Sequence, residues 1–272
     1  DGVAYKDAYQ KFNASDEQTL RYTSISWVNR FEVIENKSGH FLPFLGAFVI
    51  TWVRFDMPEL PEVETVLRGL APVIEGQKIN KATVNRPDLR WPFPKKMAER
   101  LDGQFILQLR RRSKYILADL SSQETLLIHL GMSGRILISG NRLGQYVRPH
   151  SMPAKHDHVI LDFSNGARIT FNDPRRFGAM DLFDTACESR NKFLTHLGPE
   201  PLGNEFDTEK FVKKVKRHKS PIKSVLLDQR IIAGLGNIYV CETLFRAGIS
   251  PKKISDKISL SRLKTLIPHI RD

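Results

Sequence analysis

The residues most able to do chemistry stand in the segment MPELPEVET, residues 57–65, where Pro58 is followed directly by Glu59. A free α-amine titrates at about 8, so a useful fraction is neutral at pH 7, whereas a lysine side chain at about 10.4 is almost wholly protonated. A neutral amine is a nucleophile that can form a covalent iminium with a carbon electrophile. In this sequence Met57 and 56 further residues precede Pro58, so its nitrogen is an amide without a basic lone pair. Amine chemistry here therefore needs a chain that begins at Pro58.

A helix is expected to follow and to fix the direction of these side chains. Pro61 suits the first position of a helix, and Glu62 suits the positive end of the helix dipole. One apolar face recurs at helical spacing, formed by Val63, Val66, Leu67 and Leu70. Pro72 and Gly76 are expected to close the helix. Glu59 and Glu62 should therefore lie at the helix entrance beside Pro58 and not on the buried face. Acids at a helix entrance are ordinarily residues of the first turn without a catalytic role.

Five later segments combine glycines or a basic run with polar side chains. In order they are RRSKY (111–115), HLGMSG (129–134), DPRRFG (173–178), HLGPEP (196–201) and GLGNIY (234–239). Each is a weak signal alone, because Lys114 after three arginines is usually a solvated edge, Met132 is usually core, and a Gly-rich turn usually just connects helices. Their order behind MPELPEVET carries much more information than any one of them.

Together these segments resemble the formamidopyrimidine-DNA glycosylase family. The resemblance implies a bifunctional DNA glycosylase and AP lyase of base excision repair, which removes oxidised purines such as 8-oxoguanine and formamidopyrimidines. It implies that Pro58 is the nucleophile that forms a Schiff base and leads to β,δ-elimination. It also implies that Glu59 handles protons at the sugar ring and that Lys114 contacts a phosphate beside the lesion.

The same resemblance implies a partner, double-stranded DNA that contains oxidised bases. The target nucleotide must leave the base stack, because its anomeric carbon is otherwise out of reach. Met132, Arg175 and Phe177 match the positions that fill the vacated space and hold the orphaned base. Lys223 and Asn237 match positions that contact phosphates near the lesion.

Two alternatives stay open at this point. The first is an endonuclease VIII-like enzyme for oxidised pyrimidines, although MPELPEVET and the loop around Met132 fit the purine branch better. The second is a DNA-binding fragment without catalysis, which the blocked nitrogen of Pro58 favours. Substrate profiling separates the first from the leading hypothesis, and borohydride trapping separates the second.

The pattern of the chain predicts an α+β fold with two domains. Alternating strand-like runs, including a two-residue hairpin turn at Asn165-Gly166, follow one leading helix and predict an antiparallel β-sandwich over residues 57–185. Helical periodicity then predicts a helix-two-turn-helix domain over residues 186–272, with a helix at 208–219, one capped by Ser220, and one from Asn237 to Gly248.

The charge balance favours a polyanionic partner. The chain holds 42 Lys and Arg against 30 Asp and Glu, and 36 of the basic and 23 of the acidic residues lie after residue 56. Such a surplus supplies the sequence-independent part of nucleic-acid affinity. A basic protein without such a partner is the alternative. We expect a cytoplasmic, nucleoid-associated bacterial monomer.

Metal and cofactor sites are not expected. Cys187 and Cys241 are far apart and form no C-x-x-C pair, so free thiols in a reducing compartment are favoured over zinc. His156 and His158 stand two residues apart without an obvious third ligand. The family normally binds one zinc through a C-terminal finger, and no such element precedes Asp272, so we expect a truncated fragment without a cofactor.

Residues 1–56 contain no motif to which chemistry can be attached. Spurious upstream translation or a fused remnant is favoured, ahead of a genuine accessory segment and of a membrane or targeting element. The apolar run at 41–53 is shorter than the roughly 20 residues that span a bilayer.

Overall fold

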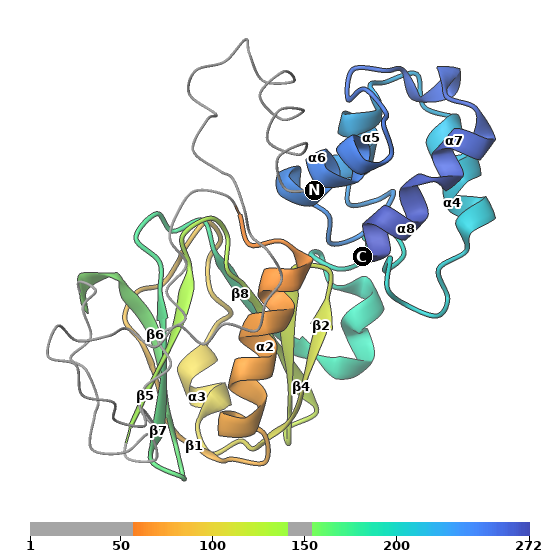
Figure 1. The fold of residues 1–272 in the computed structure, drawn as a ribbon. Helices are drawn as coiled ribbons and strands as arrows, with labels where there is room; N and C mark the ends of the chain where they lie inside the picture. Colours follow the sequence, from red (N-terminus) through yellow and green to blue (C-terminus); the bar gives the residue numbers. More distant parts are fainter. Residues whose placement is uncertain (1–56, 141–153) are drawn as a thin grey trace, which may run out of the picture. The chain divides into compact units, whose positions relative to one another are not determined.

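The computed structural model describes residues 57–140 and 154–272. The predictions for residues 1–56 lie outside the described residues and stay predictions. The described chain forms an antiparallel β-sandwich led by one helix, followed by a helical domain (Figure 1). The predicted α+β class is therefore confirmed.

The leading helix is α2, Leu60–Ile74, with Glu59 as its N-cap. Its buried side chains repeat at helical spacing, and they are Leu60, Val63, Val66, Leu70 and Ile74. The prediction that Pro72 closes the helix was wrong, because Pro72 lies inside it, whereas Gly76 does follow the C-cap, Glu75, with a left-handed φ of 71°. A proline there removes one N–H donor, but the helical pattern resumes at Glu75, whose N–H donates to Ala71 O at 3.0 Å, and burial of Ile74 stabilises the last turn.

Two four-stranded antiparallel sheets follow, with the short helix α3, Met97–Leu101, between β1 and β2 in the chain. The first sheet has the order β1-β6-β7-β5, from Ile79–Val84, Asp157–Phe163, Ala167–Asn172 and Arg135–Gly140. The second has the order β2-β3-β4-β8, from Ile106–Arg112, Tyr115–Leu120, Glu124–His129 and Ala179–Asp184. A hairpin does join β6 to β7 at Asn165-Gly166, but its loop has three residues, 164–166, and not the predicted two. Gly166 takes a left-handed φ of 81°, whereas Asn165 does not take the positive φ that a two-residue turn with Asn-Gly requires.

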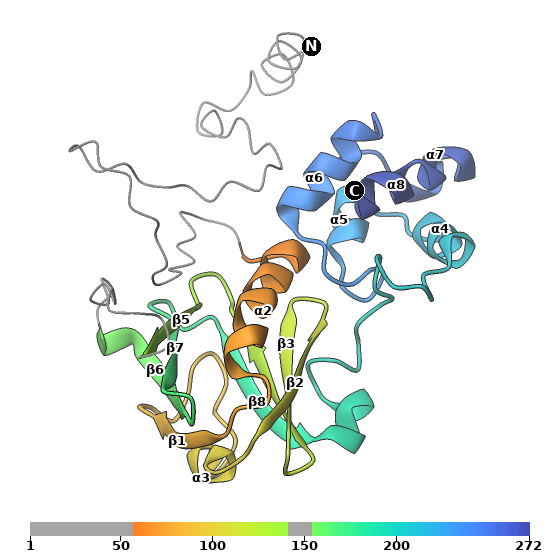
Figure 2. The ribbon, with the colours of Figure 1, turned by 60° about the horizontal axis from the view of Figure 1, so that its bottom comes forward.

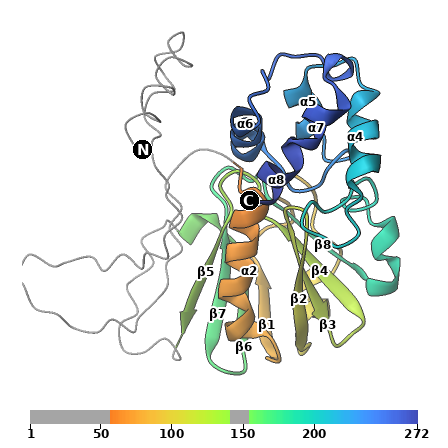
Figure 3. The same ribbon diagram turned by 45° about the vertical axis from the view of Figure 1, so that its right-hand side comes forward.

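One hydrophobic core joins α2 to both sheets. It contains Val63 and Leu70 from the helix, Phe171 from the first sheet and Ile116 from the second. Figure 3 shows α2 running between the two sheets. Short 3-10 helices, Ala154–His156 and Thr185–Arg190, precede β6 and follow β8.

The helical domain, drawn in cyan to dark blue in Figure 2, has its own core. In this core Phe211, Leu226, Val240 and Leu263 are almost fully buried. Its elements are α4, α5, α6, η4, α7 and α8, which span Thr208–Lys216, Ile222–Leu227, Asn237–Arg246, Ser255–Lys257, Leu260–Lys264 and Leu266–Arg271. The N-cap of α5 is Pro221, one residue later than the predicted Ser220. Within residues 57–140 and 154–272, no helix is long and apolar enough to cross a membrane.

Candidate active site

Three of the sequence segments meet because strand pairing brings them to one end of the second sheet. Tyr115 at the start of β3 pairs with His129 at the end of β4, which pairs with Ala179 at the start of β8. Lys114 directly precedes the first of these residues, the segment 130–134 follows the second, and the segment 173–178 precedes the third. Neighbouring strands lie about 4.8 Å apart, so these loops are close neighbours.

The turn that carries Lys114 is held by a cluster of ionic hydrogen bonds. Ser113 takes a φ of 56°, and its N–H donates to Glu200 Oε1 at 2.5 Å. Arg111 Nη1 and Arg112 Nη1 donate to the same carboxylate at 2.9 and 2.6 Å. Glu200 comes from the HLGPEP segment, so the structure gives this segment a role in fixing the turn between β2 and β3.

Glu59 is buried at the contact between α2 and the start of α6, with 1% of its surface exposed. Its carboxylate accepts hydrogen bonds from the backbone N–H groups of Gly236 at 2.7 Å, Ile238 at 2.8 Å and Tyr239 at 3.2 Å. Its place at the helix entrance was predicted, but its burial against the GLGNIY segment was not. The adjoining Pro58 is half-buried.

The two charged groups beside Pro58 have pKa values shifted by burial. Loss of water raises the pKa of Glu59, although the three N–H groups and the charge of Lys114 oppose this shift. Burial likewise lowers the pKa of Lys114, which is 7% exposed, against the opposing charges of Glu59 and Glu62. Glu62 accepts hydrogen bonds from the Glu59 N–H and the Tyr239 hydroxyl, both at 3.0 Å. The site thus pairs a carboxyl group and an amine that both resist ionisation.

The loops at 129–134 and 173–178 are held together by hydrogen bonds and by close backbone packing. The Ser133 hydroxyl bonds to the buried Asp173 carboxylate and accepts from the Arg175 N–H at 3.1 Å. Gly131 lies so close that a Cβ there would meet the Phe177 carbonyl carbon at 2.4 Å. The structure therefore brings the Met132 loop and the Arg175–Phe177 loop side by side.

The apolar side chains of these loops remain accessible. Met132 is 36% and Phe177 40% exposed, so neither belongs to a core. The Arg175 guanidinium carbon lies 4.7 Å from the centroid of the Phe177 ring, which fixes an apolar and a cationic group together at the tip of the loop.

Lys223 and Asn237 lie in the helical domain. Asn237 is exposed as the first residue of α6, within the run of N–H groups that binds Glu59. Lys223 is half-buried on α5, and its N–H donates to Pro251 O at 3.3 Å. Among the described residues, no hydrogen bond or ion pair joins Lys223 to the other predicted site residues.

His129 belongs to the same site, although its sequence pattern predicted no functional role for it. Its ring centroid lies 4.9 Å from that of Tyr115. Burial, with the charges of Lys114 and Arg90, lowers its pKa to about 4, so the imidazole is neutral at pH 7. Its place as the first residue of HLGMSG was the only available signal.

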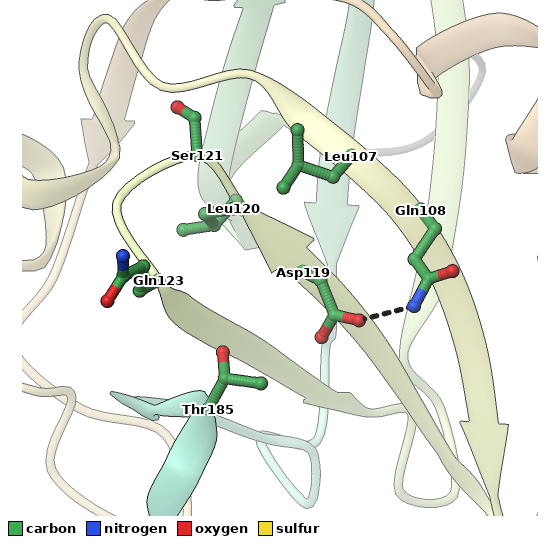
Figure 4. A pocket seen from close by; sticks show the side chains of 7 residues that line it. All are labelled: Leu107, Gln108, Asp119, Leu120, Ser121, Gln123 and Thr185. Carbon is green, nitrogen blue, oxygen red and sulfur yellow. Dashed lines mark hydrogen bonds between the residues drawn. The ribbon is translucent and has the colours of Figure 1, made fainter.

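A separate hollow of about 550 Å³ lies on the second sheet and includes none of these residues (Figure 4). Its lining carboxylate, Asp119, already accepts hydrogen bonds from Gln108, Arg110 and Thr125. In the described part of the chain, no three His, Cys, Asp or Glu side chains are grouped so that they could hold a metal ion.

Comparison with known proteins decides the family. The model of the formamidopyrimidine-DNA glycosylase N-terminal domain matches residues 57–180, and that of the formamidopyrimidine-DNA glycosylase H2TH domain matches residues 197–272. The formamidopyrimidine-DNA glycosylase of Ruegeria pomeroyi is 64% identical over 215 residues, 79% of this chain and 76% of that protein. The chain belongs to the formamidopyrimidine-DNA glycosylase family. Its class of activity is therefore that of a DNA glycosylase in base excision repair.

Solved structures of this family agree with the assignment. The Lactococcus lactis formamidopyrimidine-DNA glycosylase bound non-covalently to DNA with an AP site superposes with a TM-score of 0.69 at 32% identity, over 78% of each chain. The same glycosylase with DNA containing FAPY-dG gives a TM-score of 0.69 at 32% identity, over 78% of this chain and 77% of that chain. The roles of individual residues in the present family member stay predictions.

Proposed function

We propose that this chain, when it begins at Pro58, removes 8-oxoguanine and formamidopyrimidines from double-stranded DNA and then cleaves the abasic site by β,δ-elimination. The observation that carries the proposal is the burial of Glu59 next to Pro58, with the desolvated amine of Lys114 nearby. A carboxyl group with a raised pKa suits proton transfer near neutral pH.

In the proposed reaction, the Pro58 nitrogen bonds to C1′ of the damaged nucleotide while the bond from C1′ to the base breaks. The base leaves with that electron pair and takes up the proton that the proline nitrogen loses, and Glu59 donates a proton to the ring oxygen O4′ as the bond from C1′ to O4′ breaks. Opening of the sugar ring gives an iminium between proline and the former C1′. The iminium acidifies the neighbouring C–H bond, so the 3′ and then the 5′ phosphate are eliminated, and water releases the proline.

The proposed DNA contacts involve the loops at 129–134 and 173–178. Met132 and Phe177 are exposed apolar groups on a rigid support, which suits wedges that fill the space of an extruded nucleotide. Arg175 would hold the orphaned base, whereas Lys223 and Asn237 would contact phosphates. The Lactococcus lactis relative bound to DNA with FAPY-dG supports both the DNA partner and the preference for oxidised purines.

The test is substrate profiling of a chain that begins at Pro58. Duplexes with 8-oxoguanine, a formamidopyrimidine, an oxidised pyrimidine or an abasic site would be compared in single-turnover excision, with borohydride trapping in parallel. We expect excision of the two purine lesions and a trapped adduct on the abasic duplex. Excision confined to the pyrimidine would indicate an endonuclease VIII-like enzyme, and binding without any trapping would indicate a DNA-binding protein without catalysis.

A further inference from the structure

Gln229 lies between α5 and α6, outside every segment that the sequence analysis singled out, yet its side chain makes three hydrogen bonds within the turn that leads to α6. Its Nε2 donates to Leu235 O at 2.7 Å and to Leu227 O at 3.2 Å. Its Oε1 accepts from the Gly234 N–H at 2.8 Å. The bonds to the Gly234 N–H and to Leu235 O fix the backbone of the turn on both sides of Gly234.

The same residue also contacts two segments of the chain that come earlier. Gln229 Oε1 accepts from the Ser113 hydroxyl at 3.2 Å, and the Gln229 carbonyl accepts from the Gly198 N–H at 2.8 Å. Ser113 belongs to RRSKY and Gly198 to HLGPEP. Gln229 is therefore the point at which three motif segments meet.

The two turns that Gln229 contacts lie next to the groups around Pro58. Gly234 O accepts the Leu60 N–H at 3.1 Å, so the turn is bonded to the first residue of α2. Two residues further on, the N–H groups of 236, 238 and 239 bind the Glu59 carboxylate. On the other side, Ser113 directly precedes Lys114.

We propose that Gln229 is a positioning residue, which ties the β2–β3 turn to the turn before α6 and so holds Lys114 and the N–H donors of Glu59 in alignment on Pro58. An amide is required, because only an amide of this length offers an acceptor to Gly234 and Ser113 together with donors to Leu227 and Leu235. The effect on reaction rate rests on the proposed function, whereas the effect on Glu59 does not.

The first experiment needs no chemistry and uses the full chain. The Glu59 carboxyl is titrated by carbon NMR in the wild type, in Gln229→Met, which is similar in volume but has no hydrogen bonds, and in Ser113→Ala, which removes only the bond between the two turns. Gln108→Met is the matched control, since Gln108 also loses a 2.8 Å side-chain bond, to Asp119, but outside the site.

We expect Gln229→Met to raise the Glu59 pKa further and Ser113→Ala to raise it less, because displaced N–H donors stabilise the carboxylate less well. The other charged or titratable groups that act on Glu59 or on its partner Glu62, namely Lys114 and Tyr239, are unchanged in every variant. Gln108→Met should titrate like the wild type. A wild-type Glu59 titration in both Gln229→Met and Ser113→Ala overturns the proposal. If Gln229→Met does not fold, the Ser113→Ala titration alone decides.

The second experiment measures single-turnover excision in chains that begin at Pro58. Misalignment of about 1 Å can cost about 100-fold in rate, so we expect a fall of at least about tenfold in Gln229→Met with little change in duplex affinity. An unchanged rate contradicts the proposed effect on catalysis. Absence of excision in the parent chain would instead refute the proposed function, while the titration still tests the positioning role.

Discussion

The Gly236 N–H donates to Glu59 Oε2 at 2.7 Å, and a Cβ added to Gly236 would lie 2.4 Å from Glu59 Cδ. No real Cβ makes so close a contact, so only glycine allows the start of α6 to meet this carboxylate. The N-terminal ends of α2 and α6 are thus in close contact, although Glu59 and Gly236 are 177 residues apart in the sequence.

Gly236→Ala should therefore destabilise the protein and displace Glu59. Overpacking of this kind costs typically about 1–3 kcal/mol, and we expect a loss of that size in the free energy of unfolding, measured by denaturant titration. Gly203→Ala is the matched control, because its nearest new contact is an ordinary 3.5 Å. Equal stability of the two variants would contradict the fit between Gly236 and Glu59.

Glu59→Gln, in a chain that begins at Pro58, should lower base excision strongly while duplex binding stays nearly intact. Loss of a positioned proton-transfer group typically costs about 100-fold or more. The amide also turns an N–H donor toward backbone N–H groups, so we expect a stability loss of about 1–3 kcal/mol as well. Single-turnover excision at a temperature where the variant is fully folded separates the two effects, and a near-wild-type rate would refute the assignment.

Met132→Ala and Phe177→Ala should weaken binding to lesion-containing DNA more than binding to undamaged DNA. A wedge offsets part of the unstacking cost only when a nucleotide leaves the helix. Leu107→Ala is a suitable control, since Leu107 is 60% exposed but lines the separate hollow on the second sheet. If the two variants lose thermal stability yet discriminate normally, both side chains serve packing instead.

The stability of the protein should fall as pH drops from 6.5 to about 4, in part because of His129. Its pKa is lowered from 6.5 to about 4, so over this window the unfolded state binds a proton that the folded state does not, and stability decreases with falling pH. At most about 3 kcal/mol follows from a shift of this size, and the contribution is smaller because the residue as a whole is only half-buried.

The raised pKa of Glu59 acts in the opposite direction, since its contribution is lost as pH rises through the folded pKa. The difference between the wild type and His129→Asn isolates the histidine. We expect the unfolding free energy of His129→Asn to vary less between pH 4 and 6.5, measured by denaturant titration at several pH values. Parallel profiles would show that His129 does not titrate in this way.

Local signals in the sequence predicted much of the fold but little of the site's electrostatics. The position of the hairpin at Asn165-Gly166 and the apolar face of α2 depend on neighbouring residues, and both were predicted correctly, although the hairpin loop has three residues and not two. Pro72 was misread because the core contact of Ile74 outweighs one lost hydrogen bond. Burial of Glu59 and the junction at Gln229 depend on contacts with residues distant in the chain, which no local pattern encodes.

The last prediction concerns the nitrogen of Pro58, which is an amide wherever Met57 precedes it. A chain of residues 1–272 should form no borohydride-trapped adduct through Pro58, although its basic surface can still bind DNA. A chain that begins at Pro58 should form that adduct, because its α-amine titrates at about 8 and is partly neutral at pH 7. Lys114 is the only competitor that the described site offers, since burial lowers its pKa and favours the neutral amine.

The two chains should be compared on an abasic-site duplex, which needs no base recognition, and the crosslinked peptide should be mapped by mass spectrometry. Lys114→Met in each chain provides the control. If the shorter chain is trapped at residue 58 and the longer chain is not trapped, the proline is the nucleophile. Equal trapping of an intact 1–272 chain would refute that role, and its loss in Lys114→Met would assign the nucleophile to Lys114, whose desolvation beside Glu59 favours the neutral, nucleophilic form of its amine.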